Sequence, residues 1–115
     1  MRARHDLTPK ARTILSARKA MRMQHKFLIH KRGDHVGVAT SAIREGERAV
    51  GVYMDDDSAV EIGARGDVPL GHKIAVRDAG PGEEIIEYGV RIGKAPEGFA
   101  VGDYVHIHNL KSARW

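Results

Sequence analysis

The sequence predicts a domain built entirely from β-strands. Thirteen glycines and only six aromatic residues among 115 suit short strands joined by tight turns. No segment after residue 24 places apolar residues at the spacing of a helix. A unit made of a glycine turn, an acidic residue and an apolar strand occurs three times, at residues 44–50, 80–86 and 100–105. Their irregular spacing indicates separate hairpin turns and not a solenoid.

The first 22 residues differ from the rest and predict a helix. Thr8 suits the helix N-cap and Pro9 suits the first helical position. Residues at helical spacing follow, namely Ala11, Ile14, Leu15, Arg18 and Met21. We therefore expect a basic helical extension over residues 1–22 and a β domain over residues 23–115.

Charge is distributed unevenly between these two parts. Seven of the nineteen Lys and Arg residues lie in residues 1–22 with one acidic residue, whereas residues 23–115 carry twelve basic and fourteen acidic residues. The body therefore has no basic stripe, and a nucleic-acid partner is not expected. Three interpretations of the extension stay open. In the first, the true first residue of the protein is Met21 or Met23 and the extension is not part of it. In the second, the extension is a docking or membrane-surface helix. In the third, it is an organelle-targeting segment.

Five strands are predicted in the body, at residues 26–30, 36–39, 73–76, 84–87 and 104–109. A turn at residues 31–34 joins the first two strands. In the last strand, polar and apolar residues alternate. Tyr104, His106 and His108 should therefore share one face of that strand.

Several functions are excluded by what the sequence lacks. The chain has no cysteine, which rules out disulfides, thiolate metal sites and cysteine nucleophiles and indicates a cytoplasmic protein. It has no apolar run of about 18 residues, so no membrane span is expected. It also has no nucleophile-elbow serine, Walker loop or dinucleotide fingerprint.

The histidines supply the candidate chemistry. His106 and His108, followed by Asn109, would present two imidazoles to one metal or anion if they share a strand face. The simpler interpretation is a pair of surface histidines. His72 and Lys73 follow a Pro/Gly turn, where a carboxylate could bind and the imidazole could move a proton. The simpler interpretation there is a polar strand start.

Two groups of residues that contain aspartate complete the candidates. His30, Asp34 and His35 surround one turn, in which Asp34 either joins a site or only forms the turn. Residues 55–57 are three consecutive aspartates. They indicate a solvated turn in preference to a weak cation site, because no series of ligands continues from them.

Four segments together resemble, in order and rough spacing, the N-terminal SAF domain of altronate and galactarate dehydratases. They are residues 30–39 (HKRGDHVGVA), 69–76 (PLGHKIAV), 85–95 (IIEYGVRIGKA) and 102–111 (GDYVHIHNLK). The resemblance runs from about Lys26 to Lys111 and implies a β-clip fold. In the long dehydratases a catalytic body follows this domain. A chain that stops here resembles the split members, in which the SAF domain is a free small subunit beside a large catalytic subunit.

The resemblance also implies a chemistry. In this family a proton leaves the carbon that bears the hydroxyl and carboxylate of a small 2-hydroxy acid, the β-substituent departs as water or sulfite, and a 2-oxo acid results. Iron(II) or another divalent cation takes part, and we expect the large subunit to hold it. Motif position makes His72 and Lys73 the expected catalytic residues. The expected substrate-binding residues are His30, His35, His106, His108 and Asn109.

The short chain has little room for a complete metal site. We therefore expect it to complete or gate a site built mostly by its partner, as the small subunit of a carbon–sulfur or carbon–oxygen lyase. One alternative is the small subunit of an altronate/galactarate-type sugar-acid dehydratase. Another is a non-catalytic SAF module that binds a carbohydrate or an anion.

Overall fold

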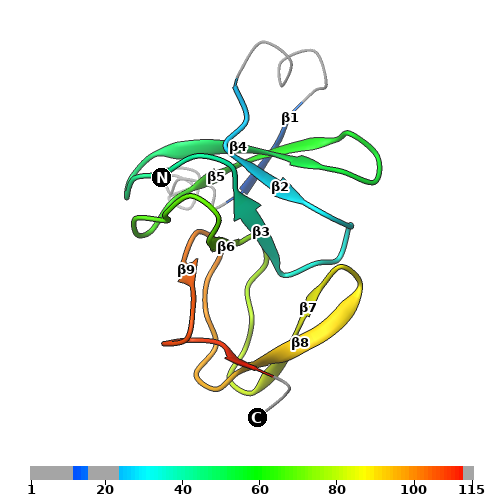
Figure 1. Ribbon diagram of the computed structural model, residues 1–115, viewed down its shortest axis with the longest axis vertical. Coiled ribbons are helices and arrows are strands. Elements are labelled where there is room, and N and C mark those ends of the chain that lie inside the picture. The colour runs from blue at the N-terminus through cyan, green and yellow to red at the C-terminus, as the bar shows by residue number, and fades with distance from the viewer. Residues whose placement is uncertain (1–11, 16–23, 113–115) are drawn as a thin grey trace, which may run out of the picture.

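The computed structural model describes residues 12–15 and 24–112, and the described residues form strands and turns without a helix (Figure 1). The predicted all-β fold is confirmed. No helix able to cross a membrane occurs in this part of the chain. The strands are β1 (Arg12–Leu15), β2 (Phe27–Ile29), β3 (Val36–Ala39), β4 (Arg48–Tyr53), β5 (Ala59–Gly63), β6 (Lys73–Ala75), β7 (Glu83–Glu87), β8 (Val90–Ala95), β9 (Tyr104–Val105) and β10 (Lys111–Ser112).

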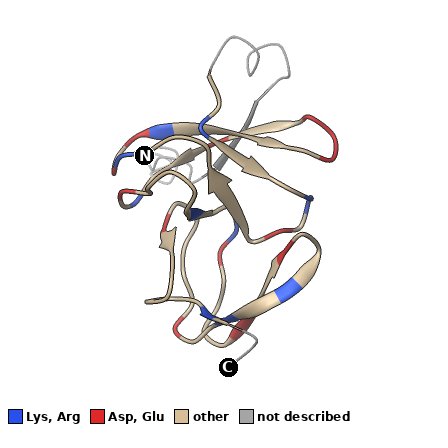
Figure 2. Ribbon diagram, viewed as in Figure 1, with Lys and Arg blue, Asp and Glu red and all other residues tan. Residues whose placement is uncertain are grey.

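The strands form two sheets. The larger has the order β1-β5-β4-β2-β3-β6-β9, and every pair in it is antiparallel except β2 with β4. The smaller has the order β10-β8-β7 and is antiparallel throughout. Figure 1 shows the β7–β8 hairpin beyond the start of β3, at the opposite end of the molecule from β1. Basic and acidic residues are interspersed along both sheets (Figure 2).

The buried side chains form two hydrophobic groups. The first surrounds Phe27 within the large sheet and its loops. A Cβ at Gly51 of β4 would overlap the Phe27 ring, so only glycine fits there. The second group draws on both sheets and packs them together. Its members are Val36, Ala75, Ala79, Ile85, Ala95, Phe99 and Val105, with Ile92 and Leu110 partly buried against them.

Asp34, in the turn between β2 and β3, connects the tip of the β7–β8 hairpin to the large sheet. Its side chain is 1% exposed and accepts three main-chain hydrogen bonds. Oδ2 accepts from the N–H of Lys31 at 3.2 Å and of Tyr88 at 3.0 Å, and Oδ1 accepts from the N–H of Gly89 at 3.1 Å. The bond from Lys31 confirms the interpretation of Asp34 as a turn former. The other two connect that turn to the β7–β8 tip, where Tyr88 and Gly89 both have positive φ.

His35 makes the second connection between the sheets. Its main-chain N–H donates to the carbonyl of Ile86 at 2.8 Å, and the N–H of Ile86 donates to the ring Nδ1 at 3.0 Å. The ring Nε2 lies 2.8 Å from Oε2 of Glu83. Because Nδ1 accepts a hydrogen bond, the ring proton must be on Nε2, from where it donates to Glu83. His35 is thus held at both ring nitrogens inside the fold.

Residues 104–109 do not form one strand, and this prediction was wrong. The strand β9 ends at Val105, and a turn follows. The side chain of Asn109 forms that turn, since its Oδ1 accepts from the N–H of His106 at 2.9 Å and its Nδ2 donates to the carbonyl of Tyr104 at 2.9 Å. An Asn side chain that bonds nearby backbone competes with the strand ladder. The alternating pattern gave no sign of this competition.

The helix predicted in the first 22 residues is wrong for the part that is described. Residues 12–15 form β1, which pairs antiparallel with β5. Without β1, the outer edge of β5 would present unpaired N–H and C=O groups. β-Branched residues such as Thr13 and Ile14 favour a strand. Pairing with that edge outweighs the weak local preference for a helix. The rest of the predicted helix lies outside the described residues.

Asp34→Asn should lower the free energy of unfolding by about 1–3 kcal/mol. An amide offers one acceptor oxygen where the carboxylate offers two, and its NH₂ group would face a main-chain N–H. Denaturant unfolding at neutral pH measures the change. The matched control is Asp57→Asn at an exposed position with positive φ, which asparagine tolerates. Equal stability of the two variants would contradict the role given to Asp34.

Candidate functional site

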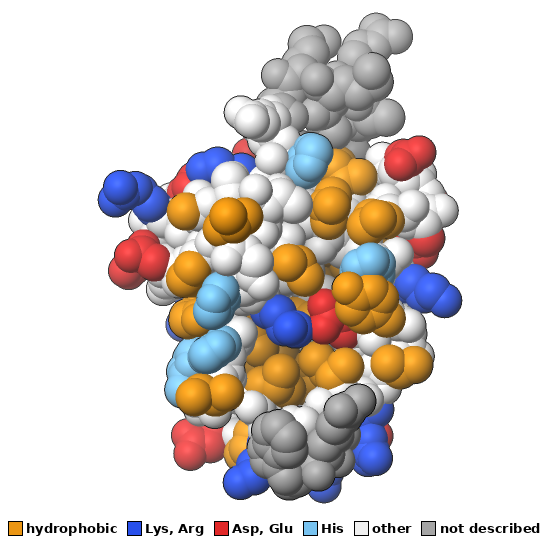
Figure 3. Space-filling view, in the orientation of Figure 1, with side chains coloured by type: hydrophobic (Ala, Val, Ile, Leu, Met, Phe, Trp, Pro, Cys, Tyr) orange, Lys and Arg blue, Asp and Glu red, His pale blue; other side chains and the backbone are white. Residues whose placement is uncertain are grey.

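A cleft of about 560 Å³ lies where the large and small sheets meet. His72 and Lys73 enter it at the start of β6, and Glu87 enters at the end of β7. The turn after β9 supplies His106 and Ile107. Figure 3 shows histidine side chains on both sides of a neighbouring cationic and acidic pair, above a hollow with hydrophobic side chains. The cleft therefore combines apolar walls with a few convergent polar groups, as small-molecule sites do.

Local backbone contacts fix the position of His72. Gly71 has φ +82°, which allows the tight turn before β6. Its N–H donates to the carbonyl of Ala39 at 2.8 Å, and the N–H of Ala39 donates back to the carbonyl of His72 at 2.8 Å. The turn is thereby tied to the end of β3. His72 is placed by the main chain of a central strand and not by a free loop.

Tyr104 lies among three imidazoles. Its hydroxyl is 2.7 Å from Nδ1 of His72, and this bond fixes the orientation of that ring. The rings of His72 and His106 have centroids 5.1 Å apart. The Tyr104 ring lies 5.5 Å from that of His106 and 5.7 Å from that of His108. The sequence placed Tyr104 on the face of the two histidines but gave no sign of its bond to His72.

The floor of the cleft holds a lysine and a buried carboxylate. Nζ of Lys73 lies 3.7 Å from Oε1 of Glu87. The side chain of Glu87 is 6% exposed, against 34% for Lys73. Burial raises the pKa of Glu87, and the ammonium of Lys73 opposes that rise. Sequence reasoning missed Glu87 as a site residue, because the topology alone brings β7 opposite β6.

The other expected site residues are placed differently. His30 stacks on Tyr88 at the hairpin tip, with ring centroids 3.7 Å apart, and lies outside the cleft lining. His35 is 3% exposed and both of its ring nitrogens contact protein atoms, so its ring lies in the protein interior. Asn109 forms the turn described above.

His106 and His108 do not share one strand face. His106 lines the cleft, whereas His108 lines a second hollow of about 690 Å³ on the other side of the same turn. The rings of His106 and His108 both lie close to the ring of Tyr104. The structure therefore brings His72, Lys73 and His106 together, and the role predicted for them stays a prediction.

The described residues contain no group of three or more His, Asp or Glu side chains placed to hold a metal ion. The site residues of this chain do not fit the divalent cation that the family resemblance implies.

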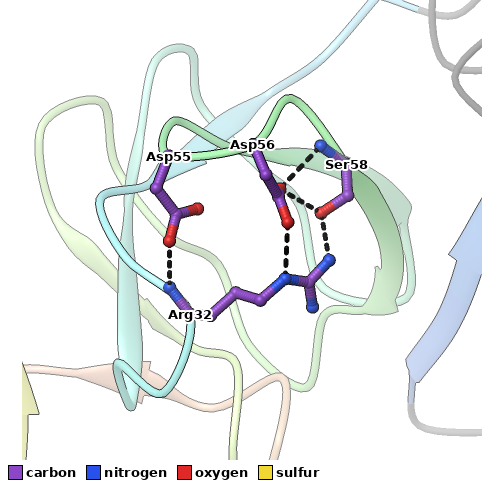
Figure 4. Close-up of polar contacts among 4 residues, drawn as sticks. All are labelled: Arg32, Asp55, Asp56 and Ser58. Atoms are coloured by element: carbon purple, nitrogen blue, oxygen red, sulfur yellow. Dashed lines mark hydrogen bonds and ion pairs between the residues drawn. The ribbon is translucent and has the colours of Figure 1, made fainter.

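The three aspartates at residues 55–57 form a turn, as preferred from the sequence (Figure 4). Asp55 accepts from the N–H of Arg32 at 2.9 Å, and Asp56 accepts from Nε of Arg32 at 2.6 Å. Asp56 also accepts from the N–H of Ser58 at 3.0 Å and from its hydroxyl at 2.6 Å. The Arg32 guanidinium lies 4.7 Å from the centre of the Tyr53 ring. This network joins the β2–β3 turn to the β4–β5 turn.

Hydrogen bonds from Ser58 and Arg32 lower the pKa of Asp56 to about 2, from an ordinary value of 3.8. A depressed carboxyl pKa stabilises the fold above pH 3.8, and this stability is lost as the pH falls through about 2. Asp56→Asn should therefore be less stable than wild type at pH 7 and should lose less stability between pH 4 and pH 2. Thermal unfolding at a series of pH values tests this. Parallel stability curves for the two proteins would contradict the assignment.

Comparison with known proteins agrees with this architecture. The sequence profile of the altronate/galactarate dehydratase SAF domain matches residues 25–113. The (2R)-sulfolactate sulfo-lyase subunit alpha of Chromohalobacter salexigens is 35% identical over 94 residues, which are 81% of this chain and 100% of that protein. The subunit of the same name from Paracoccus pantotrophus is 39% identical over 64 residues, which are 56% of this chain and 96% of that protein.

A longer relative matches through one part only. The altronate dehydratase of Bacillus subtilis is 36% identical over 92 residues, which cover 78% of this chain and 17% of that enzyme. The matched family profile covers more than half of the chain, and the relative from Chromohalobacter salexigens is matched over its whole length. This chain therefore belongs to the altronate/galactarate dehydratase SAF domain family.

Proposed function

We propose that this chain is the small subunit of a two-component lyase that releases sulfite from (2R)-sulfolactate. The observation that carries the proposal is the match to two sulfo-lyase alpha subunits over 100% and 96% of their length. The second candidate is the small subunit of a sugar-acid dehydratase. It is supported by altronate dehydratases at 36% and 37% identity, in which the matched region is only 17% and 15% of the enzyme.

The reaction requires charge stabilisation at both ends of a small dianion. A proton leaves C2, the C3–sulfur bond breaks, and sulfite takes the bonding electrons. The resulting enol takes up a proton at C3, loses its hydroxyl proton and becomes pyruvate. A base, an electrophile for the developing enolate and a cation near the leaving group are needed. The cleft offers the ammonium of Lys73 and the imidazoles of His72 and His106, whose ring centroids lie 5.1 Å apart.

Each cleft residue has a proposed role. His72 transfers a proton, with its ring held by Tyr104 at 2.7 Å. Lys73, half-exposed at the cleft floor, binds the carboxylate or the sulfonate. His106, whose ring lies 5.1 Å from that of His72, binds the other end of the substrate. His108 and His30 lie at the margins and would contact the partner or guide the substrate.

The large subunit would complete the site. Several large hydrophobic side chains are exposed, and Ile107, at 85%, lines the cleft itself. Leu70, which lies in the turn just before His72, is 65% exposed. Exposed apolar side chains around a polar site suit a protein interface. We propose that the large subunit covers these residues, closes the cleft and holds iron(II) or another divalent cation. We also propose that the assembled enzyme is cytoplasmic.

Activity should depend on both subunits. The purified chain alone should release neither sulfite from (2R)-sulfolactate nor water from altronate or galactarate, with or without ferrous iron. The chain combined with its large subunit should release sulfite from sulfolactate. Turnover by the isolated chain would contradict the proposal of a shared site. Turnover of altronate or galactarate in place of sulfolactate by the assembled enzyme would favour the second candidate.

His72→Ala should lower kcat/KM of the assembled enzyme by roughly tenfold to a thousandfold, the range of a lost proton donor or electrostatic contact. Lys73→Met should act in the same direction. The matched control is His25→Ala, since His25 is exposed and lies outside the cleft lining. Association with the large subunit is measured in parallel. Wild-type rates in the His72 variant, with association intact, would remove this residue from the mechanism.

A further inference from the structure

Glu87 is a carboxylate placed where the proposed anionic substrate would bind. Its side chain is 6% exposed and lines the cleft, with Oε1 3.7 Å from Nζ of Lys73. Neither His72 nor Lys73 needs a buried acid for the roles proposed above. A negative charge at this position opposes the binding of another anion, so its presence calls for an explanation.

The charged groups around Glu87 come from three elements. Lys73 is at the start of β6, His30 follows the end of β2, and Asp34 lies in the β2–β3 turn. Lys73 and His30 favour the ionised form of Glu87, whereas Asp34 disfavours it. Glu87 thus lies near both a lysine and a second carboxylate. Lys73 is 34% exposed, so its ammonium faces Glu87 on one side and the open cleft on the other.

A dianion in the cleft would change this balance. Its charge would compete with Glu87 for the ammonium of Lys73, in a site that is shielded from water on the Glu87 side. Like charges that share one site cannot all stay ionised at low cost. Protonation of Glu87 removes the repulsion and frees Lys73 for the anion. Burial already favours the neutral form of this carboxyl, so the cost of protonation is reduced.

We propose that a small carboxylate–sulfonate dianion binds in the cleft together with a proton on Glu87, so that Lys73 turns from Glu87 to the anion. The inference rests on the proposed function of the cleft and adds a positioning residue to it. Glu87 would hold Lys73 in place while the cleft is empty and release it when the substrate arrives. Affinity should consequently rise as the pH falls through the pKa of Glu87.

The test uses sulfoacetate and the purified full chain. Sulfoacetate is a dianion of this class that cannot undergo β-elimination, because its sulfonate is on the carbon next to the carboxylate. Affinity is measured by calorimetry, and proton uptake is measured with an electrode in weakly buffered solution between about pH 5 and 7. Glu87→Gln should bind sulfoacetate about tenfold more tightly at pH 7, which corresponds to a pKa difference of one unit between the free and bound states. It should also take up fewer protons on binding.

The matched control is Glu84→Gln on the same strand. Glu84 is exposed and pairs with Arg91 at 2.8 Å, outside the cleft lining. It should match wild type in both affinity and proton uptake. If Glu87→Gln does not fold, the carboxyl carbon resonance of Glu87 in the wild-type chain gives the answer. Sulfoacetate added at constant pH should move that resonance toward the protonated form.

The outcomes separate the two proposals. Binding of sulfoacetate with equal proton uptake in wild type and Glu87→Gln, or with an unmoved Glu87 resonance, would overturn this inference alone. Weaker binding by Glu87→Gln with unchanged proton uptake would show that Glu87 only holds Lys73 in place, and would also overturn it. If sulfoacetate shifts no resonance of His72, Lys73 or His106 in any variant, the proposed substrate cleft fails, and this inference fails with it.

Discussion

The structure depends on two adjacent residues that hold one hairpin. Asp34 accepts hydrogen bonds from the two residues at the β7–β8 tip, and His35 exchanges hydrogen bonds with Ile86 in the middle of β7. Both residues are almost completely buried. A buried polar network of this kind is costly when one member is removed, because its partners are left unsatisfied. The hairpin therefore has one well-defined position on the large sheet.

The site follows from that position. With β7 held against the large sheet, Glu87 faces Lys73 of β6, and the second hydrophobic group fills the space behind them. The turn after β9 then forms one wall of the cleft, with His106 beside His72. The result is an open surface that carries cations and imidazoles but no cluster of metal ligands among the described residues. We propose that another chain completes the site at this surface.

The sequence predicted the parts of the fold that depend on local chemistry. Glycine turns and apolar runs located β2, β3, β6 and β7, and residues 36–39 form β3 as expected. The strand predicted over residues 104–109 failed because Asn109 binds the backbone on both sides of a turn. Residues 12–15 pair with the open edge of β5, which a local pattern cannot reveal.

The site was predictable only where its residues lie in one segment. His72 and Lys73 stand side by side in the sequence, and a Pro/Gly turn marks them. Glu87 reaches the cleft only because a distant strand brings it there. His35, which we expect to bind substrate, has both ring nitrogens against protein atoms, and its role stays a prediction. Burial and partners, which decide between a structural and a functional histidine, are tertiary properties.

Amide hydrogen exchange tests the central claim, that Asp34 and His35 fix the hairpin and so create the cleft. The amides of Ile86, Tyr88 and Gly89 donate to side chains of these two residues. Exchange of these three amides should need an opening free energy close to that of the amides in β3 and β6, because the hairpin and the large sheet would open together. Rapid exchange of the three hairpin amides, while β3 and β6 stay protected, would show that the hairpin moves independently and would contradict the account.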